Sequence, residues 1–159
     1  MPSIDLSDLA NAVNMARERF IYGLEQTPDE QLNQSASETA KSPLRLAASA
    51  VRFLGFMGPM LKDGTRPDRN AEWPVMETRE AAIQQVDAAF RGLEAAVASL
   101  TDEDLARPMT VPWGAVVPTS TMVVFGVGAL GYIQGQLNYA QTVYGDMEPN
   151  IPPQWFPKP

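Results

Sequence analysis

The 159-residue sequence contains no cysteine and no histidine. Without cysteine there are no disulfides and no thiolate nucleophiles, and without histidine there is no Ser-His-Asp triad. Zinc sites built on imidazole or thiolate ligands are excluded for the same reason. Most common catalytic chemistries are therefore closed to this chain, and we expect it to use no metal ion and no other cofactor.

Basic residues and long apolar runs are also scarce. The chain has 12 Lys and Arg against 19 Asp and Glu, a formal net charge of -7, which is the wrong sign for binding nucleic acid phosphates. No run reaches the roughly 18 apolar residues that span a bilayer. The first residues mix Asp5 and Asp8 into an apolar pattern and lack the basic segment of a signal peptide. We expect no nucleic-acid partner, no membrane association and a cytoplasmic location.

What the sequence does contain is helical periodicity. Apolar residues make up 45% of the chain, and in four segments they recur at three- and four-residue spacing. The helices are expected over about residues 6–24, 43–61, 78–100 and 120–144. Pro59 should end or kink the second helix, because proline cannot donate the helical hydrogen bond. No segment shows the alternating pattern of a strand.

Two short segments between these helices look alike. Residues 27–32 and 101–105 each combine a capping threonine, an acidic first turn and a leucine. They indicate either a weak internal repeat or the restricted chemistry of helix caps. The whole pattern predicts one all-α domain over residues 1–159, a four-helix bundle with a proline-rich C-terminal tail over residues 144–159.

The segment YIQGQLNYAQTVYGD, residues 132–146, resembles the C-terminal helix of the DinB-like superfamily, the DinB/YfiT-like proteins. Members typically carry His-x-x-x-His-x-Gly-Gln, followed by an aromatic residue and a Gly-Asp stop. Here the Gly-Gln pair is Gly135-Gln136, so Ala129 and Ile133 stand at the two histidine positions. The third histidine usually lies in a serine-rich opening of the second helix, where this chain has Ser49.

Many proteins of that superfamily bind a divalent metal through these three histidines, and characterised branches resemble transferases or isomerases that act on low-molecular-weight thiols. Alanine and isoleucine have no donor atom, and a neutral serine hydroxyl is a poor ligand alone. The resemblance therefore implies the family's four-helix scaffold and its frequent homodimers, in a variant without the metal-binding histidines.

Without three imidazoles, the bundle contains either a packed core or an apolar pocket. Helical spacing places Ala129, Ile133 and Gln136 on one face of the last helix, with Tyr132 at its margin. Arg52 is either an anchor for a carboxylate or phosphate or a surface arginine, and Gln136 binds either a ligand or a neighbouring backbone. The candidate ligand-binding residues are Ser49, Arg52, Ala129, Tyr132, Ile133 and Gln136.

Two further groups of residues have open interpretations. Four glycines of the last helix allow close approach of a neighbouring helix or of a second copy of the chain; they are Gly126, Gly128, Gly131 and Gly135. The three tryptophans, Trp73, Trp113 and Trp155, lie outside the expected helices. They form either a lid over a pocket or a plug in the core.

These observations leave three functional hypotheses. The favoured one is a protein that binds a small organic molecule in the bundle cavity, as a divergent metal-independent enzyme or a carrier. The alternative is a non-catalytic structural or interaction protein that acts as a homodimer. A third, an oxygen-only metal site that includes Glu18 or Glu25, has no supporting spacing in the sequence. A continuous cavity lined by Ser49, Arg52, Ala129, Ile133 and Gln136 favours the first hypothesis. A dry and closed region at the former metal positions favours the second.

Overall fold

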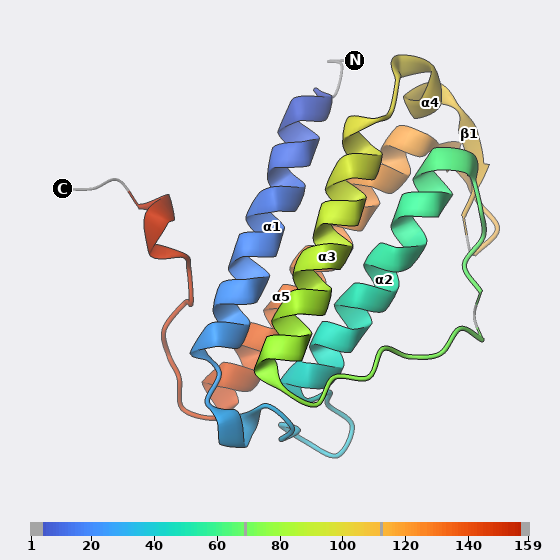
Figure 1. The fold of residues 1–159 in the computed structure, drawn as a ribbon. Helices are drawn as coiled ribbons and strands as arrows, with labels where there is room; N and C mark the ends of the chain where they lie inside the picture. The colour runs from blue at the N-terminus through green and yellow to red at the C-terminus, as the bar shows by residue number, and fades with distance from the viewer. Residues whose placement is uncertain (1–4, 69, 112, 157–159) are drawn as a thin grey trace.

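The fold is a bundle of four long helices. The computed structural model describes residues 5–68, 70–111 and 113–156. The long helices are α1 (Leu6–Gln26), α2 (Pro43–Asp63), α3 (Arg79–Ala98) and α5 (Thr119–Val143), and they are accompanied by the short α4 (Asp102–Ala106) and the 3-10 turns η1 (Asp29–Gln31) and η2 (Pro153–Trp155) (Figure 1). The predicted all-α four-helix bundle is confirmed.

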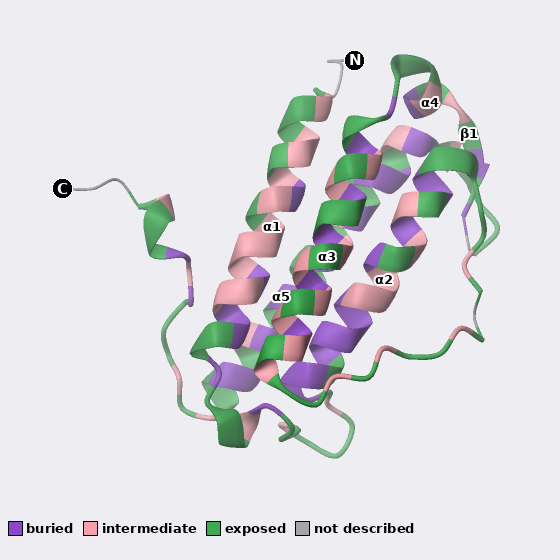
Figure 2. Cartoon of the chain, in the orientation of Figure 1, coloured by how far each residue is buried: buried purple, intermediate pink, exposed green. Residues whose placement is uncertain are grey.

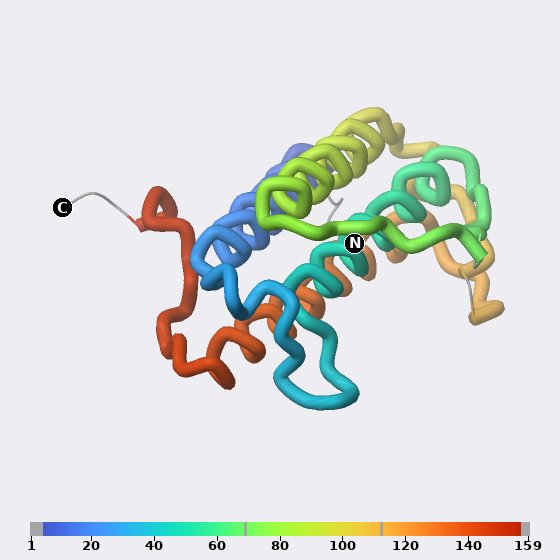
Figure 3. The backbone as a smooth tube through the Cα atoms, turned by 60° about the horizontal axis from the view of Figure 1, so that its bottom comes forward, coloured from blue at the N-terminus to red at the C-terminus, as the bar shows by residue number. Residues whose placement is uncertain are grey.

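The helices form two parallel pairs. Figure 1 shows α1 and α5 running in one direction and α2 and α3 in the other. Residues 64–68 and 70–78 lie along the bundle between the end of α2 and the start of α3, as the tube in Figure 3 shows. Within the bundle, α3 packs against both α1 and α2, and α5 packs on the other side of the same two helices.

The core lies where the apolar stripes of the long helices meet (Figure 2). Phe20 of α1 and Phe90 of α3 pack with their ring centroids 6.4 Å apart, and Leu54 and Leu137 are buried beside this layer in the same cluster. Gly126 of α5 permits a close approach to α2, since a Cβ built there would lie 2.6 Å from the Cε atom of Met57. The predicted close packing at glycine therefore applies to Gly126.

Helix α2 continues past Pro59, so of the two expected effects of this proline, ending or kinking the helix, the first is excluded. The carbonyl of Gly55, four residues earlier, loses its helical donor, but Gly55 is exposed and water can replace that bond. The helix ends instead at Gly64, whose φ of 77° is the left-handed conformation that favours glycine. By length and composition α2 is apolar enough to cross a membrane, yet half of its apolar window is buried inside the bundle.

A short β-hairpin was missing from the expected elements. Strands β1 (Pro108–Thr110) and β2 (Val116–Pro118) pair antiparallel, with Met109 opposite Val117. Three residues are too few to show an alternating pattern, so neither strand was predicted. The turn places Trp113 against Phe125 of α5, with their ring centroids 5.2 Å apart.

Thr27 and Thr101, which occur in similar sequence segments, have different structural roles. Thr101 forms a full capping box with Asp104 at the start of α4, as predicted. Thr27 does not cap η1; it ends α1, where its hydroxyl donates to the carbonyl of Gly23 at 2.9 Å. The likeness therefore arises from restricted cap chemistry in one case and from a buried helix end in the other.

The buried end of α1 is held by side chains of α3 and α5. Gln141 Nε2 donates to the carbonyl of Gly23 at 2.8 Å and to Thr27 Oγ1 at 3.2 Å. Arg79 donates to the carbonyls of Leu24 and Thr27, and it pairs with Asp29. The last carbonyls of a helix have no intrahelical donor, so these bonds satisfy groups that would otherwise be buried and unpaired.

We expect Arg79→Met to lower the free energy of unfolding by about 2 to 3 kcal/mol, because it removes a charged donor from two partly buried carbonyls. Arg91→Met on the same helix is the matched control. Arg91 is exposed and pairs only with Asp87 among the described residues, so its loss should destabilise the protein much less than the loss of Arg79. Urea denaturation of both variants measures the difference, and equal losses would contradict this role of Arg79.

Candidate functional site

Ser49 stands at the first of the family's metal-binding positions, and its hydroxyl is already occupied. It donates to the carbonyl of Arg45 at 2.8 Å and accepts from the ammonium group of Lys41 at 2.9 Å. A positive charge at hydrogen-bond distance from the only oxygen at this position repels a divalent cation.

The other two positions contribute no donor atom. Ala129 is half-buried and Ile133 is buried at the edge of the core. Because α2 and α5 run in opposite directions and Gly126 faces Met57, equal helical rise places Ile133 near the level of Ser49 in the bundle. The positions that the superfamily resemblance assigns on α2 and α5 thus lie at a similar level along the bundle axis. The side chains at these positions do not fit a metal ion.

The remaining predicted residues lie near the surface. Tyr132 is 69% exposed, and Gln136 Nε2 donates to its hydroxyl at 3.0 Å. Gln136 does not tie α5 to another backbone; Gln141 does. The guanidinium of Arg52 lies 4.4 Å from the centroid of the Trp73 ring and 5.5 Å from that of Phe56. Whether any of the six candidates binds a ligand stays a prediction.

An oxygen-only metal site also lacks support. The described residues contain no group of three or more Asp, Glu, His or Cys side chains that could hold a metal ion. Glu18 accepts hydrogen bonds from Trp155 and Asn14, and Glu25 is exposed. The donor set in the described part of the chain therefore does not fit the metal that the superfamily resemblance implies.

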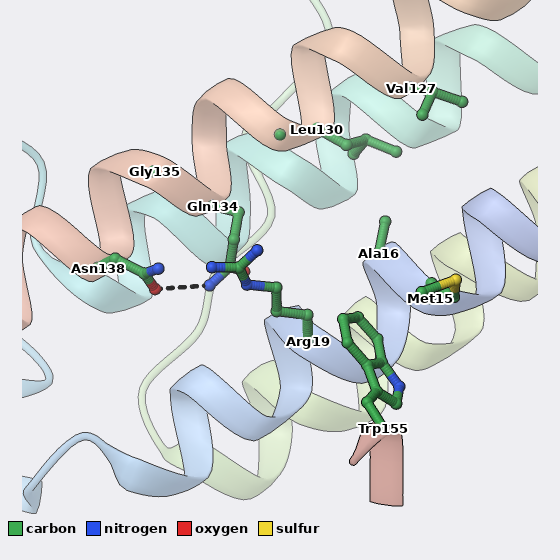
Figure 4. Close-up of a pocket in the computed structure, with 10 residues that line it drawn as sticks. Met15, Ala16, Arg19, Val127, Leu130, Gln134, Gly135, Asn138 and Trp155 are labelled. Atoms are coloured by element: carbon green, nitrogen blue, oxygen red, sulfur yellow. Dashed lines mark hydrogen bonds between the residues drawn. The ribbon is translucent and has the colours of Figure 1, made fainter. Parts of the chain in front are cut away.

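A pocket of about 270 Å³ lies between α1 and α5 (Figure 4). It contains none of the six residues expected from the sequence. Its lining residues are Met15, Ala16, Arg19, Val127, Leu130, Gly131, Gln134, Gly135, Asn138 and Trp155. The α5 members recur at three- and four-residue spacing and form a strip separate from that of Ala129, Ile133 and Gln136. The pocket and the family's metal positions are thus on different flanks of α5.

The pocket has an apolar end and a polar end. Since α1 and α5 are parallel, their earlier residues line one end together: Met15, Val127 and Leu130. Figure 4 shows the guanidinium of Arg19 extending from α1 toward Gln134 and Asn138 at the other end. Gln134 Nε2 donates to Asn138 Oδ1 at 2.8 Å.

Two polar atoms at the polar end are buried and unpaired. Arg19 Nε and Gln134 Oε1 are inaccessible to solvent and have no hydrogen-bond partner. Buried polar groups without partners are rare in native proteins, because each costs about 1 to 3 kcal/mol. Such atoms beside a pocket mark a place where a ligand can supply the missing partners.

Trp155 forms one wall of this pocket from the C-terminal tail. Its indole nitrogen donates to Glu18 Oε2 at 2.8 Å and thereby fixes the tail against α1. The lid interpretation of the tryptophans therefore suits Trp155. Trp113 packs on α5 at the hairpin, and Trp73 lies beside α2 among the cationic groups of Lys41, Arg45 and Arg52.

Sequence reasoning missed Arg19 and Gln134, although one signal was present. Gln134 and Gln141 are seven residues apart, which places both on the same face of α5, and that face also carries buried Leu130 and Leu137. Polar residues on an otherwise apolar face indicate buried polar contacts. No signal in the sequence shows that Arg19 rather than Arg17 lacks a carboxylate partner. That difference arises because Asp87, on helix α3 and distant in sequence, pairs with Arg17.

Known proteins share this fold. The family model of the DinB superfamily matches residues 12–130. No curated protein matches the chain. A DinB-like protein from Bacillus subtilis is 16% identical, and the match covers 91% of this chain and 96% of that one, with a TM-score of 0.74.

Two further solved structures are similar at lower identity. YfiT from Bacillus subtilis, described as a probable metal-dependent hydrolase with an unusual four-helix bundle topology, is 11% identical; the match covers 91% of this chain and 92% of YfiT, with a TM-score of 0.66. The mycothiol-dependent maleylpyruvate isomerase is 13% identical, with 93% of this chain and 66% of the isomerase covered and a TM-score of 0.64. At these identities the likeness establishes the shared fold alone.

We expect the contact between Trp155 and Glu18 to weaken in acid. The indole hydrogen bond is the main cause that lowers the pKa of Glu18 below its ordinary value of 4.5. A carboxyl group with a lowered pKa stabilises the folded state above its ordinary pKa, and this contribution is lost as the pH falls toward the lowered value. Trp155→Phe should raise the Glu18 pKa, measured by NMR titration, while the control Trp113→Phe should not. An unchanged titration in Trp155→Phe would contradict the contact.

Proposed function

Because the chain belongs to the DinB superfamily but has no ligand set at that family's metal-binding positions, we propose that it binds a small organic molecule without a metal ion, in the pocket between α1 and α5. Binding there serves either a divergent metal-independent enzyme or a carrier. The proposal includes the cytoplasmic location expected from the sequence.

The pocket is the observation that carries this proposal. Its volume of about 270 Å³ is close to the lower end of the size range of small-molecule sites, and such sites combine apolar walls with a few polar groups. Here one end is apolar and the other holds a guanidinium and two amides. The space between α1 and α5 is open, which supports ligand binding there, although this pocket is not the cavity expected around Ser49, Ala129 and Ile133.

The neutral apolar dye N-phenyl-1-naphthylamine tests binding, since its fluorescence rises in apolar surroundings. We expect the wild-type protein to bind the dye and Gly131→Phe to weaken binding by roughly tenfold or more, which corresponds to about 1.4 kcal/mol. Gly131 lines the pocket, and a Cβ built there meets nothing within 4 Å, so the added ring has room to occupy the pocket.

Gly92→Phe is the matched control for this experiment. Gly92 lies in the exposed middle of α3, and a Cβ there also meets nothing within 4 Å. Both substitutions replace a helical glycine by the same side chain, so their effects on helix propensity are similar. Loss of binding in Gly131→Phe alone supports the proposal. No binding to wild type, or equal binding to both variants, contradicts it.

A second candidate function, assembly as a homodimer, rests on the outer face of α5. This 25-residue helix contains no charged residue, although the chain has a net charge of -7. It exposes large apolar side chains, namely Val124, Phe125, Tyr132, Tyr139 and Val143. A second copy of the chain can cover this face without bringing like charges together, as a two-fold contact requires.

We expect the wild-type protein to sediment as a dimer at micromolar concentration and Tyr132→Glu to weaken dimerisation by at least about tenfold, because two carboxylates would then meet near the two-fold axis. Val75→Glu is the control. Val75 is 75% exposed, but it lies in the loop between α2 and α3. A wild-type monomer at this concentration would exclude the dimer, as would equal weakening by both variants.

A further inference from the structure

The pocket between α1 and α5 contains one unneutralised charge. Of the described residues that line it, Arg19 alone is charged. No ion pair or hydrogen bond joins Arg19 to another described residue, and its Nε atom is buried without a partner. Arg19 is half-buried, so its guanidinium is partly desolvated without an ion pair and can accept an anion as its partner.

The nearby carboxylates are committed to other groups. Glu18, the preceding residue, accepts hydrogen bonds from Trp155 and Asn14. Asp87 of α3 pairs with Arg17 at 2.5 Å and with Arg91 at 2.7 Å. Although the chain as a whole is strongly acidic, none of the described carboxylates faces Arg19 in the pocket. An anionic partner for Arg19 would therefore be a ligand rather than one of the described carboxylates.

A second unpaired group lies beside Arg19. Gln134 Oε1 is a buried acceptor without a donor. The nitrogen of the same amide donates to Asn138 Oδ1. The polar end thus offers charged donors from Arg19 and one free acceptor from Gln134. From this end the pocket extends along the apolar side chains of Met15, Val127 and Leu130.

We infer that the ligand is a monocarboxylate with an apolar body, bound with its carboxylate on Arg19. This inference rests on the proposed function of the same pocket. The planar guanidinium matches a carboxylate with two parallel hydrogen bonds. A hydroxyl or amine on the ligand near the carboxylate would donate to Gln134 Oε1. The apolar body lies toward Val127 and Leu130, under Trp155.

The charge of the pocket favours a carboxylate over a phosphate monoester. One guanidinium neutralises one carboxylate, and the remaining described lining is neutral. A phosphate monoester carries about -1.5 to -2 charges at neutral pH, so its excess charge would remain uncompensated in a mostly apolar site. The pocket should therefore discriminate against a dianion of similar size.

Three probes with the same apolar body test the inference at neutral pH: 4-phenylbutanoate, its neutral amide and 3-phenylpropyl phosphate. We expect calorimetry to show that the wild-type protein binds the carboxylate at least about tenfold more tightly than the amide or the phosphate, the effect expected of a charge-assisted bidentate contact. In Arg19→Met the preference for the carboxylate over the amide should disappear, while N-phenyl-1-naphthylamine still binds. Arg19→Lys should keep part of the preference, since it retains the charge without the planar fork.

Arg91→Met is the control for net charge, because it removes one exposed arginine that does not line the pocket and should leave the preference unchanged. The stability of unliganded Arg19→Met distinguishes a binding role from a structural one. If Arg19 serves to bind a ligand, Arg19→Met without ligand should be about as stable as the wild-type protein. Marked destabilisation of this variant would overturn the inference.

The results separate the two proposals. If the neutral dye binds in the pocket but the carboxylate has no advantage over the amide, or the phosphate binds best, the ligand class is wrong and the proposed function stands. If the dye fails to bind and the carboxylate fails as well, both are wrong.

Discussion

The hydrogen bonds at the carboxyl end of α1 set the arrangement on which the rest of the bundle depends. Gln141 from α5 and Arg79 from α3 both donate to the last carbonyls of α1, so three helices are registered at one buried point. Because α1 and α5 are parallel, that register also determines which residues lie beside each other one turn earlier on α1 and two turns earlier on α5. Arg19 precedes Gly23 by four residues and Gln134 precedes Gln141 by seven, and this brings the guanidinium and the amide to the same end of the pocket.

The helices were predictable because their apolar spacing is local, and observed boundaries differ from expected ones by about two residues or fewer. Features that depend on distant partners were not predictable. Pro59 lies inside α2 because Gly55 is exposed, and Gln141 rather than Gln136 joins α5 to α1 because only the former faces Gly23. The hairpin strands are too short to leave a pattern in sequence. The six candidate residues came from the family's metal positions, whereas the pocket lies on the other flank of α5.

Membership in the DinB superfamily explains the scaffold and shows how little it constrains chemistry. The positions at which the superfamily resemblance implies imidazoles hold a serine bound by a lysine ammonium, an alanine and an isoleucine. On this flank of α5, Ile133 lies buried at the edge of the core. The opposite flank has the open space and the unpaired polar atoms. One bundle can therefore offer two separate regions for function, and a change at one leaves the other intact.

The wall that Trp155 contributes has a consequence for how binding relates to folding. The core is composed of residues from the four long helices and the short elements between them, and all of these precede the tail. The pocket, in contrast, draws on residues from Met15 to Trp155 and is complete only when the last of these has docked. One wall of the pocket therefore lies outside the part of the chain that forms the core, so natural variation in the tail can alter which molecules are admitted while the bundle stays the same.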